Sequence, residues 1–167
     1  MPEVVIIGGR LEGCAADWAL TQRGITDVTV VERATVGSGG TGKSSGVVRC
    51  HYGVSSLAAM ATRALDVFEN AEDVFGVDVG FHQTGYVVGV GPENVEAMRA
   101  PLASQRAVGV RTEEIDAAEV QKLWPVADLE PFGAFAWEER GGDGDAYRTA
   151  QAFAAAARRA GARLREC

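Results

Sequence analysis

The residues best placed to do chemistry near the N-terminus are the glycines of a short turn and an acidic residue that follows them. Gly8 and Gly13 occupy the first and last glycine of the pattern GxGxxG, which opens a helix that holds a diphosphate group. Glu32 follows at about the 20-residue spacing of the acid that hydrogen-bonds ribose hydroxyls. The middle glycine is replaced by Arg10, which either obstructs the phosphates or offers them a positive charge. This combination predicts a dinucleotide site with an altered phosphate contact.

A second glycine-rich segment, Gly37–Ser44, has two interpretations. It matches the P-loop pattern GxxxxGK[ST], in which Lys43 and Ser44 would bind a nucleotide phosphate and its magnesium ion. A P-loop passes directly into a helix, whereas the next residues, Ser45, Gly46 and two valines, form helices poorly. We therefore favour the other interpretation, in which the amides and hydroxyls of this loop face the same dinucleotide as the first turn. A P-loop nucleotide-binding protein stays as the alternative.

The elements that must position the first turn form a strand, helix, strand unit. A β-branched run at 3–7 predicts a strand buried on both faces, and apolar residues at helical spacing predict a helix over 11–23 that ends at Gly24. A second β-branched run predicts a strand over 28–32. Such a crossover is right-handed and makes the two strands parallel neighbours. The sequence therefore predicts an α/β fold with the glycine turn at the end of the first strand.

The pattern changes after the second glycine loop. Apolar positions predict one helix over 57–75, and 77–90 shows strand-like segments. Further predicted elements are a helix that begins at Pro92 and bends at Pro101, a capping-box helix from Asp116 to Trp124, a strand over 132–137, a helix over 146–160 capped by Asp145, and a strand over 162–164. We expect three segments: 1–76 as the dinucleotide-binding core and loop, 77–143 as part of a second lobe, and 144–167 as a helix and strand that return to the first domain.

Composition excludes several classes of partner. The formal charge of -7 and the pI near 4.9 argue against nucleic acid and against an anionic membrane, because both require clustered Lys and Arg. No apolar stretch approaches the roughly 20 residues of a membrane span, and no export signal is visible. The 3 cysteines have neither zinc-site nor disulfide-framework spacing. We expect no metal and a reducing cytoplasm.

The chain resembles the D-amino-acid-oxidase-like family of FAD-dependent oxidoreductases, nearest its sarcosine- and dimethylglycine-oxidising members. The resemblance is carried by "VVIIGGRLEGCAADWALTQRG", "VTVVER", "VGSGGTGKSSGVVRCHYG" and "AYRTAQAFAAAARRAGARL". It implies a Rossmann-like FAD-binding domain of the GR2 type, truncated, with part of an α+β substrate lobe. It also implies oxidation of the C–N bond of an amine or amino acid by hydride transfer to the flavin, without a general base.

The resemblance also assigns expected roles to individual residues. Residues on or beside FAD are Gly8, Gly9, Gly13, Glu32, Arg33, Thr41, Ser44, Ser45 and Gly46. Arg49 matches a basic position near the flavin face in relatives that bind substrate carboxylates, although pairing with FAD or with an acid of the second lobe is an equal alternative. His51 and Tyr52 follow it and are more readily explained as structural residues. Arg49 is therefore the one candidate for a substrate contact.

Family members are considerably longer than these 167 residues. We expect the chain to be the N-terminal portion of such an enzyme, or to pair with a separate chain that supplies the C-terminal half. A non-catalytic subunit of a heteromeric flavoenzyme is the remaining alternative. In each case the incomplete sheet should expose an edge and an apolar face, and the chain alone should not turn over substrate.

Overall fold

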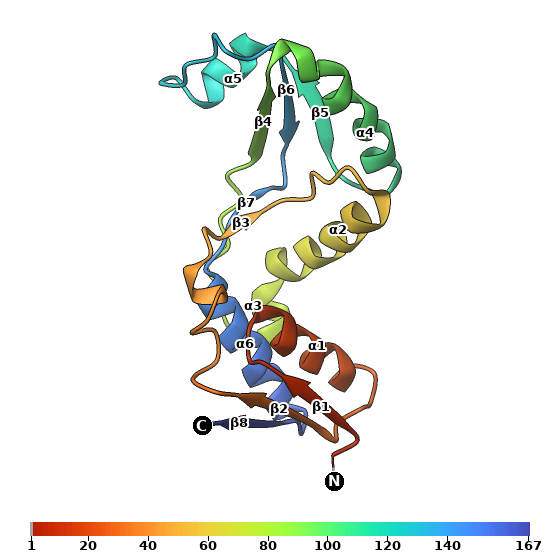
Figure 1. The fold of residues 1–167 in the computed structure, drawn as a ribbon, viewed down its shortest axis with the longest axis vertical. Helices are drawn as coiled ribbons and strands as arrows, with labels where there is room; N and C mark the ends of the chain where they lie inside the picture. Colours follow the sequence, from red (N-terminus) through yellow and green to blue (C-terminus); the bar gives the residue numbers. More distant parts are fainter. Residues whose placement is uncertain (1) are drawn as a thin grey trace. The chain divides into compact units, whose positions relative to one another are not determined.

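The computed structural model describes residues 2–167, which form two compact units (Figure 1). The first unit contains the residues up to Gly46, together with Asn70–Phe81 and Gly144–Cys167, and the second contains Val47–Glu69 and His82–Asp143. This division differs from the expected one at two places, because residues 47–69 lie in the second unit and residues 77–81 lie in the first. A short antiparallel pairing of β3 (Val47–Val48) with β7 (Gly142–Asp143) ties the start of the 47–69 segment to the second unit.

The first unit contains a three-stranded parallel sheet in the order β1, β2, β8. Its strands are β1 (Val4–Ile7), β2 (Val28–Glu32) and β8 (Arg163–Glu166). The helix α1 (Leu11–Thr21) connects β1 to β2, as the sequence pattern predicts. The sheet therefore places the end of β1, with its glycine turn, beside the end of β2, with Glu32.

Two helices cover one face of this sheet, as Figure 1 shows for α1 and α6 (Ala146–Arg159). Asp145 caps α6 by accepting a hydrogen bond from the Arg148 amide at 2.9 Å, as predicted. Many of the buried residues of α6 are alanines, which let α1 pack closely against it. Next to them the rings of Trp18, Phe75 and Phe153 meet edge to face, with centroids 4.8 to 5.8 Å apart.

The opposite face of the sheet is more exposed than the sequence predicts. β1 was expected to be buried on both faces, but its burial alternates, with Val5 54% and Ile7 89% exposed. Val4 and Ile6 point toward the buried Val28 and Ala157, on the side that the helices cover. Among the described residues, none covers Val5 and Ile7 as the helices cover Val4 and Ile6. The exposed apolar face agrees with the expectation of an incomplete sheet.

The second unit is built on an antiparallel sheet in the order β4, β6, β5. Its strands are β4 (Tyr86–Val90), β5 (Thr112–Ile115) and β6 (Ala134–Glu138). The helix α4 (Val95–Ala107) follows the turn η2 (Pro92–Asn94), contains Pro101, and packs Met98 and Leu102 against Ala134 and Ala136. The strand β5 was not predicted, because Glu113 and Glu114 at its centre interrupt the apolar pattern that is typical of a strand. It forms by pairing with β6, and Arg99 binds Glu114 through several hydrogen bonds.

The predicted helix over 57–75 is wrong in one respect, because the structure has two helices there. These are α2 (Ser55–Glu69) and α3 (Ala71–Phe75), separated by Asn70, whose φ of -111° and ψ of 28° leave the helical region. The predicted capping box of α5 (Ala117–Leu123) is confirmed, since Asp116 and Glu119 exchange hydrogen bonds. Of the predicted strand segments at 77–90, only β4 is a strand in the structure, and His82 forms a single bridge with Asp143.

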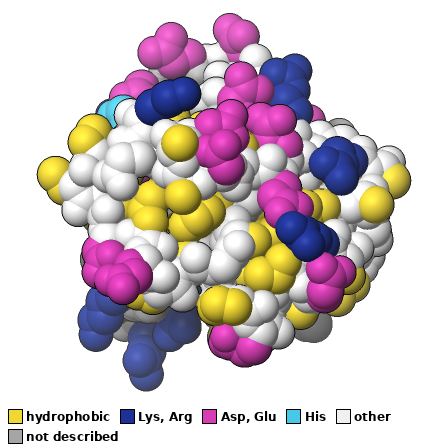
Figure 2. Space-filling view, turned by 90° about the horizontal axis from the view of Figure 1, so that it is seen from above, with side chains coloured by type: hydrophobic (Ala, Val, Ile, Leu, Met, Phe, Trp, Pro, Cys, Tyr) yellow, Lys and Arg dark blue, Asp and Glu magenta, His cyan; other side chains and the backbone are white. Residues whose placement is uncertain are grey.

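The surface carries mixed side chains, and Figure 2 shows a face on which acidic residues lie among hydrophobic ones. Among residues 2–167, no helix is both long enough and apolar enough to cross a bilayer.

Candidate functional site

The turn between β1 and α1 has the geometry that its glycines predict. Gly8 adopts a φ of 107°, which favours glycine, and its amide donates a hydrogen bond to the Val31 carbonyl at 2.8 Å. Gly13 lies so close to this turn that a Cβ built on it would be 2.1 Å from the Gly8 carbonyl oxygen. Gly8 therefore shapes the turn, and Gly13 lets α1 begin directly behind it.

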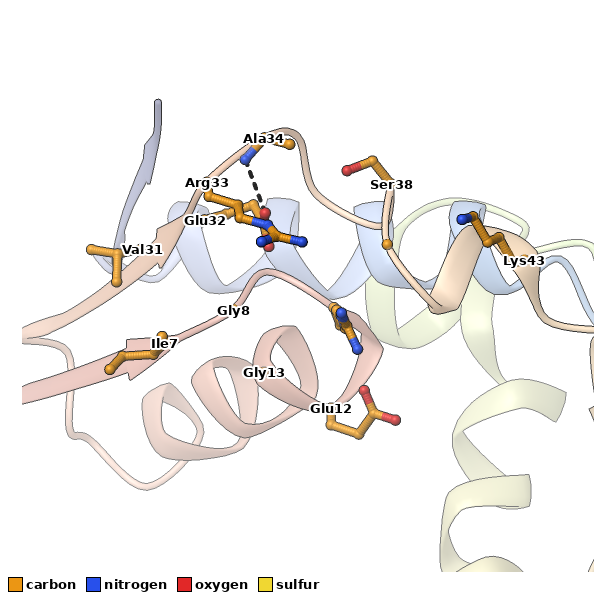
Figure 3. A pocket seen from close by; sticks show the side chains of 12 residues that line it. Ile7, Gly8, Glu12, Gly13, Val31, Glu32, Arg33, Ala34, Ser38 and Lys43 are labelled. Carbon is orange, nitrogen blue, oxygen red and sulfur yellow. Dashed lines mark hydrogen bonds between the residues drawn. The ribbon is translucent and has the colours of Figure 1, made fainter.

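Glu32 lies at the end of β2 and faces the same turn (Figure 3). One carboxylate oxygen accepts a hydrogen bond from the Gly9 amide at 2.8 Å, and the other accepts one from the Ala34 amide at 2.9 Å. These bonds, that from Gly9 first, hold the pKa of the Glu32 carboxyl below its ordinary value. Glu32 is therefore ionised at neutral pH and keeps lone pairs that can accept further hydrogen bonds.

A pocket of about 590 Å³ opens between the glycine turn and the end of β2. The lining residues include Gly8 and Gly13 from the turn, Glu32 and Arg33 from the end of β2, and Lys43 from the second glycine loop (Figure 3). The first amides of a helix have no acceptor within that helix, and Glu12 and Gly13 of the first turn of α1 border the pocket. The pocket thus combines hydrogen-bond donors, cations and the carboxylates of Glu12 and Glu32, of which Glu32 suits ribose hydroxyls.

The second glycine loop lies against the first turn. The Gly37 amide donates to the Gly9 carbonyl at 2.9 Å, and the hydroxyl of buried Thr41 accepts a hydrogen bond from the Leu11 amide at 3.0 Å. Thr41 and Ser44 line a smaller pocket of about 200 Å³, on which Arg10 also borders. Thr41 therefore satisfies one free amide of α1 and connects the two glycine segments.

The same loop contradicts the P-loop alternative. The short turn η1 (Thr41–Lys43) ends at Ser44, whose φ of -71° and ψ of 147° are extended, and β3 follows. A P-loop would continue from this lysine and serine into a helix that holds the phosphate. Because no helix begins here, Lys43 and Ser44 lack the geometry of a P-loop site.

The other predicted cofactor residues have different positions. Gly9 is buried and contributes its amide to Glu32 rather than lining the larger pocket. Gly46 has a φ of 73°, and a Cβ built on it would lie 2.3 Å from the Gly144 carbonyl oxygen. The Gly144 amide in turn donates to the Gly46 carbonyl at 2.8 Å. Gly46 thus closes a tight crossing of two chain segments, and Ser45 is an exposed residue before it.

Arg49 lies in the second unit. Its guanidinium carbon is 4.7 Å from the centre of the Tyr52 ring and 5.7 Å from that of Tyr86, and it donates to the His51 carbonyl. In the part of the chain that the structure describes, no carboxylate forms a salt bridge with Arg49. Burial, and secondarily the charge of Arg49, lower the pKa of His51.

Sequence reasoning missed the residues that hold the Arg49 segment. Glu138, 2% exposed, accepts a hydrogen bond from the Cys50 amide at 2.7 Å, and buried Gln105 donates to the Tyr52 carbonyl at 3.0 Å. Burial raises the pKa of the Glu138 carboxyl despite this bond, and also raises the pKa of the Cys50 thiol to about 12. The available signal was strand periodicity, which places Glu138 on the same face as the buried Ala134 and Ala136.

The residues present fit a bound dinucleotide. The turn keeps the close approach that Gly8 and Gly13 allow, Glu32 keeps an ionised carboxylate beside it, and the pocket stays open although the middle glycine is Arg10.

Replacing Glu32 with glutamine should destabilise the first unit at pH 7, because an amide has one acceptor oxygen where the carboxylate has two. The folded-state pKa of Glu32 lies below its ordinary value near 4.5, so the contribution of the carboxylate is present above that pH. It is lost as the pH falls through the lower folded-state value. The melting temperatures of wild type and Glu32→Gln should thus differ at pH 7 and converge in acid. Thermal unfolding monitored by circular dichroism at a series of pH values measures this.

Glu12→Gln provides the control for this variant. Glu12 lines the same pocket, but its carboxylate makes no hydrogen bond among the described residues, so at pH 7 the variant should lose only the attraction of one carboxylate to the N-terminus of α1, about 0.3 to 1 kcal/mol. A constant difference between wild type and Glu32→Gln at every pH would contradict the proposed role of the carboxylate.

Comparison with known proteins supports the geometric interpretation. Residues 3–167 match the family described as DAO, FAD dependent oxidoreductase. Mitochondrial dimethylglycine dehydrogenase of Homo sapiens is 26% identical over 164 residues, which cover 98% of this chain and 19% of that protein. Sarcosine oxidase subunit beta of Rhodobacter capsulatus is 24% identical over 76% of this chain and 31% of its own length.

Solved structures with a similar fold include L-proline dehydrogenase from P. horikoshii, with a TM-score of 0.89 and 28% identity over 98% of this chain and 43% of that one. Glycine oxidase from Bacillus cereus has a TM-score of 0.76 and 22% identity over 99% of this chain and 46% of its own. The chain thus spans about a fifth of the length of its first curated relatives and less than half of these solved chains.

Proposed function

Because the chain belongs to the FAD-dependent oxidoreductase family, we propose that it is the N-terminal portion of an enzyme that oxidises the C–N bond of a small amine or amino acid. The observation that carries this proposal is the pocket in which the Gly8–Gly13 turn faces the ionised Glu32. Relatives named for dimethylglycine, sarcosine and glycine support a substrate of that size.

Particular residues of this chain would hold the cofactor. Glu32 would accept hydrogen bonds from the ribose hydroxyls, and the first-turn amides of α1 would donate to the phosphates. Arg33 would contribute charge at the end of β2, while Thr41 and Gly46 would shape the loop that borders the site. Ser44 and Ser45 offer hydroxyls beside that loop. Bound FAD supplies an acceptor for hydride from the carbon next to a neutral amine.

We assign the substrate carboxylate to Arg49. Its guanidinium lies over the rings of Tyr52 and Tyr86 and has no salt bridge within residues 2–167. Its planar N–H groups can therefore donate two hydrogen bonds to a carboxylate. Glu138 and Gln105 fix the backbone on either side of His51 and so orient the Arg49 segment. Arg49 binds and orients the substrate in this proposal, and no residue acts as a general base.

Two features bear on partners and location. One relative is a subunit of sarcosine oxidase, and Val5 and Ile7 are exposed on the sheet, which supports a second polypeptide segment that completes the enzyme. That segment would be either the rest of the same chain or a separate subunit. The free thiols of Cys14, Cys50 and Cys167 support a reducing compartment such as the cytoplasm.

The test of this proposal is direct binding to the 167-residue chain. In the first arm, titration with FAD should quench the flavin fluorescence and leave a yellow protein after gel filtration. In the second arm, calorimetry should detect dimethylglycine but not dimethylamine, which lacks the carboxylate, and Arg49→Gln should abolish the difference. A chain that binds no FAD would overturn the cofactor assignment, and equal binding of both amines would overturn the role of Arg49.

A further inference from the structure

Arg10 stands where the dinucleotide pattern has its middle glycine, yet the turn around it is undistorted. Its φ of -84° and ψ of 178° are extended values that any L-residue adopts, so the backbone does not require glycine here. The consequence of the exchange lies in the side chain, which brings a guanidinium to the part of the pocket next to the start of α1.

The second glycine loop makes room for this side chain. A Cβ built on Gly39 would lie 2.8 Å from Arg10 Nε, whereas a Cβ built on Gly40 would lie 3.6 Å from the nearest Arg10 nitrogen, an ordinary contact. Neither glycine has a positive φ, so the conformation of the loop does not demand glycine at either position. A Cβ at position 39 would therefore have to displace the flexible Arg10 side chain, which Gly39 leaves in place.

The charge of Arg10 has no partner in the part of the chain that the structure describes, where we find neither a hydrogen bond nor a salt bridge to its guanidinium. Arg10 is also the N-cap of α1, next to the positive end of the helix dipole, where a cation is unfavourable. Arg33 and Lys43 line the same pocket, so with Arg10 its cations outnumber its carboxylates, Glu12 and Glu32, by three to two. An anion placed beside Arg10 would relieve this repulsion.

We propose that Arg10 binds the diphosphate of the dinucleotide, with Gly39 as the residue that lets its side chain lie along the loop. The inference rests on the proposed function, because the diphosphate belongs to the FAD of that proposal. The pocket of about 590 Å³ is open with Arg10 as part of its wall, which favours a binding role over obstruction. A charge thus replaces the close backbone approach that glycine allows.

The experiment compares variants of the 167-residue chain in binding FAD, ADP, adenosine and riboflavin. Arg10→Gln keeps most of the side-chain volume without its charge, and it should weaken FAD and ADP roughly ten- to a hundredfold, the range that hydrogen bonds to charged groups contribute. Adenosine and riboflavin, which lack the diphosphate, should bind as they do to wild type. Raising the salt concentration should weaken ADP binding more in wild type than in Arg10→Gln, because screening acts on the charge.

Two glycine variants test the position of the side chain. Gly39→Ala should weaken ADP binding, because its Cβ displaces Arg10, and it should cause little further loss in the Arg10→Gln background. Gly40→Ala is the matched control and should bind ADP like wild type. Circular dichroism melting curves establish that each variant is folded.

The outcomes separate this proposal from the proposed function. Unchanged ADP and FAD affinity in Arg10→Gln, or tighter binding in Arg10→Gly than in wild type, would overturn the role of Arg10 while leaving FAD binding intact. Binding of ADP that depends on Arg10, without binding of FAD, would support the diphosphate contact and overturn the flavin assignment. A wild-type chain that binds neither ligand would refute both.

Discussion

Gly13→Ala should abolish FAD binding and lower the free energy of unfolding by about 3 kcal/mol, at the upper end of the usual cost of overpacking. The alanine Cβ would lie 2.1 Å from the Gly8 carbonyl oxygen, which belongs to backbone and cannot rotate away. Either α1 moves off the turn or the turn opens, and in both cases Gly8 and Glu32 no longer share one pocket. For a chain of this size the melting temperature should fall by roughly 6 to 12 °C.

A second glycine serves as the control for this variant. A Cβ at Gly53 meets no atom within 4 Å, and Gly53 has no positive φ, so Gly53→Ala should melt and bind FAD like wild type. Thermal unfolding and FAD titration of the two variants side by side measure the effect. A Gly13→Ala protein that melts at the wild-type temperature and retains its FAD would show that α1 can shift without loss of the site.

Gly46→Ala should have a comparable effect on stability, because it combines two penalties at one position. The φ of 73° costs an L-residue about 1 to 2 kcal/mol, and the new Cβ would lie 2.3 Å from the Gly144 carbonyl oxygen. The crossing of Gly46 and Gly144 positions the loop that contains Thr41 on one side and the start of α6 on the other. We expect a total loss of about 3 kcal/mol and weaker FAD binding.

Gly24→Ala separates the two penalties, because Gly24 has a φ of 82° but its Cβ would meet nothing within 4 Å. This control should lose about 1 kcal/mol, from the backbone strain alone. Chemical denaturation of both variants gives the two free energies of unfolding. Equal losses in Gly24→Ala and Gly46→Ala would mean that the contact with Gly144 relaxes without cost.

Much of the first unit could be predicted from the sequence because its signals are local. Strand, turn and helix follow from the β-branched runs, the glycines at 8 and 13 and the helical spacing of apolar residues, and the structure confirms each. The caps at Asp116 and Asp145 follow from hydrogen bonds within one turn of helix. Elements that depend on pairing with a distant segment are harder to predict from the sequence. An example is β5, which is paired with β6.

The sequence by itself determined the kind of site, because the spacing of Gly8, Gly13 and Glu32 encodes a turn, a helix start and an acid at the end of the neighbouring strand. Only the tertiary structure decided how Arg10, which replaces the middle glycine, and the segment around Arg49 are accommodated. Arg10 lies along Gly39, and the Arg49 segment rests on the buried Glu138. Such contacts join residues far apart in the chain, and they depend on where folding places each backbone, which no local pattern records.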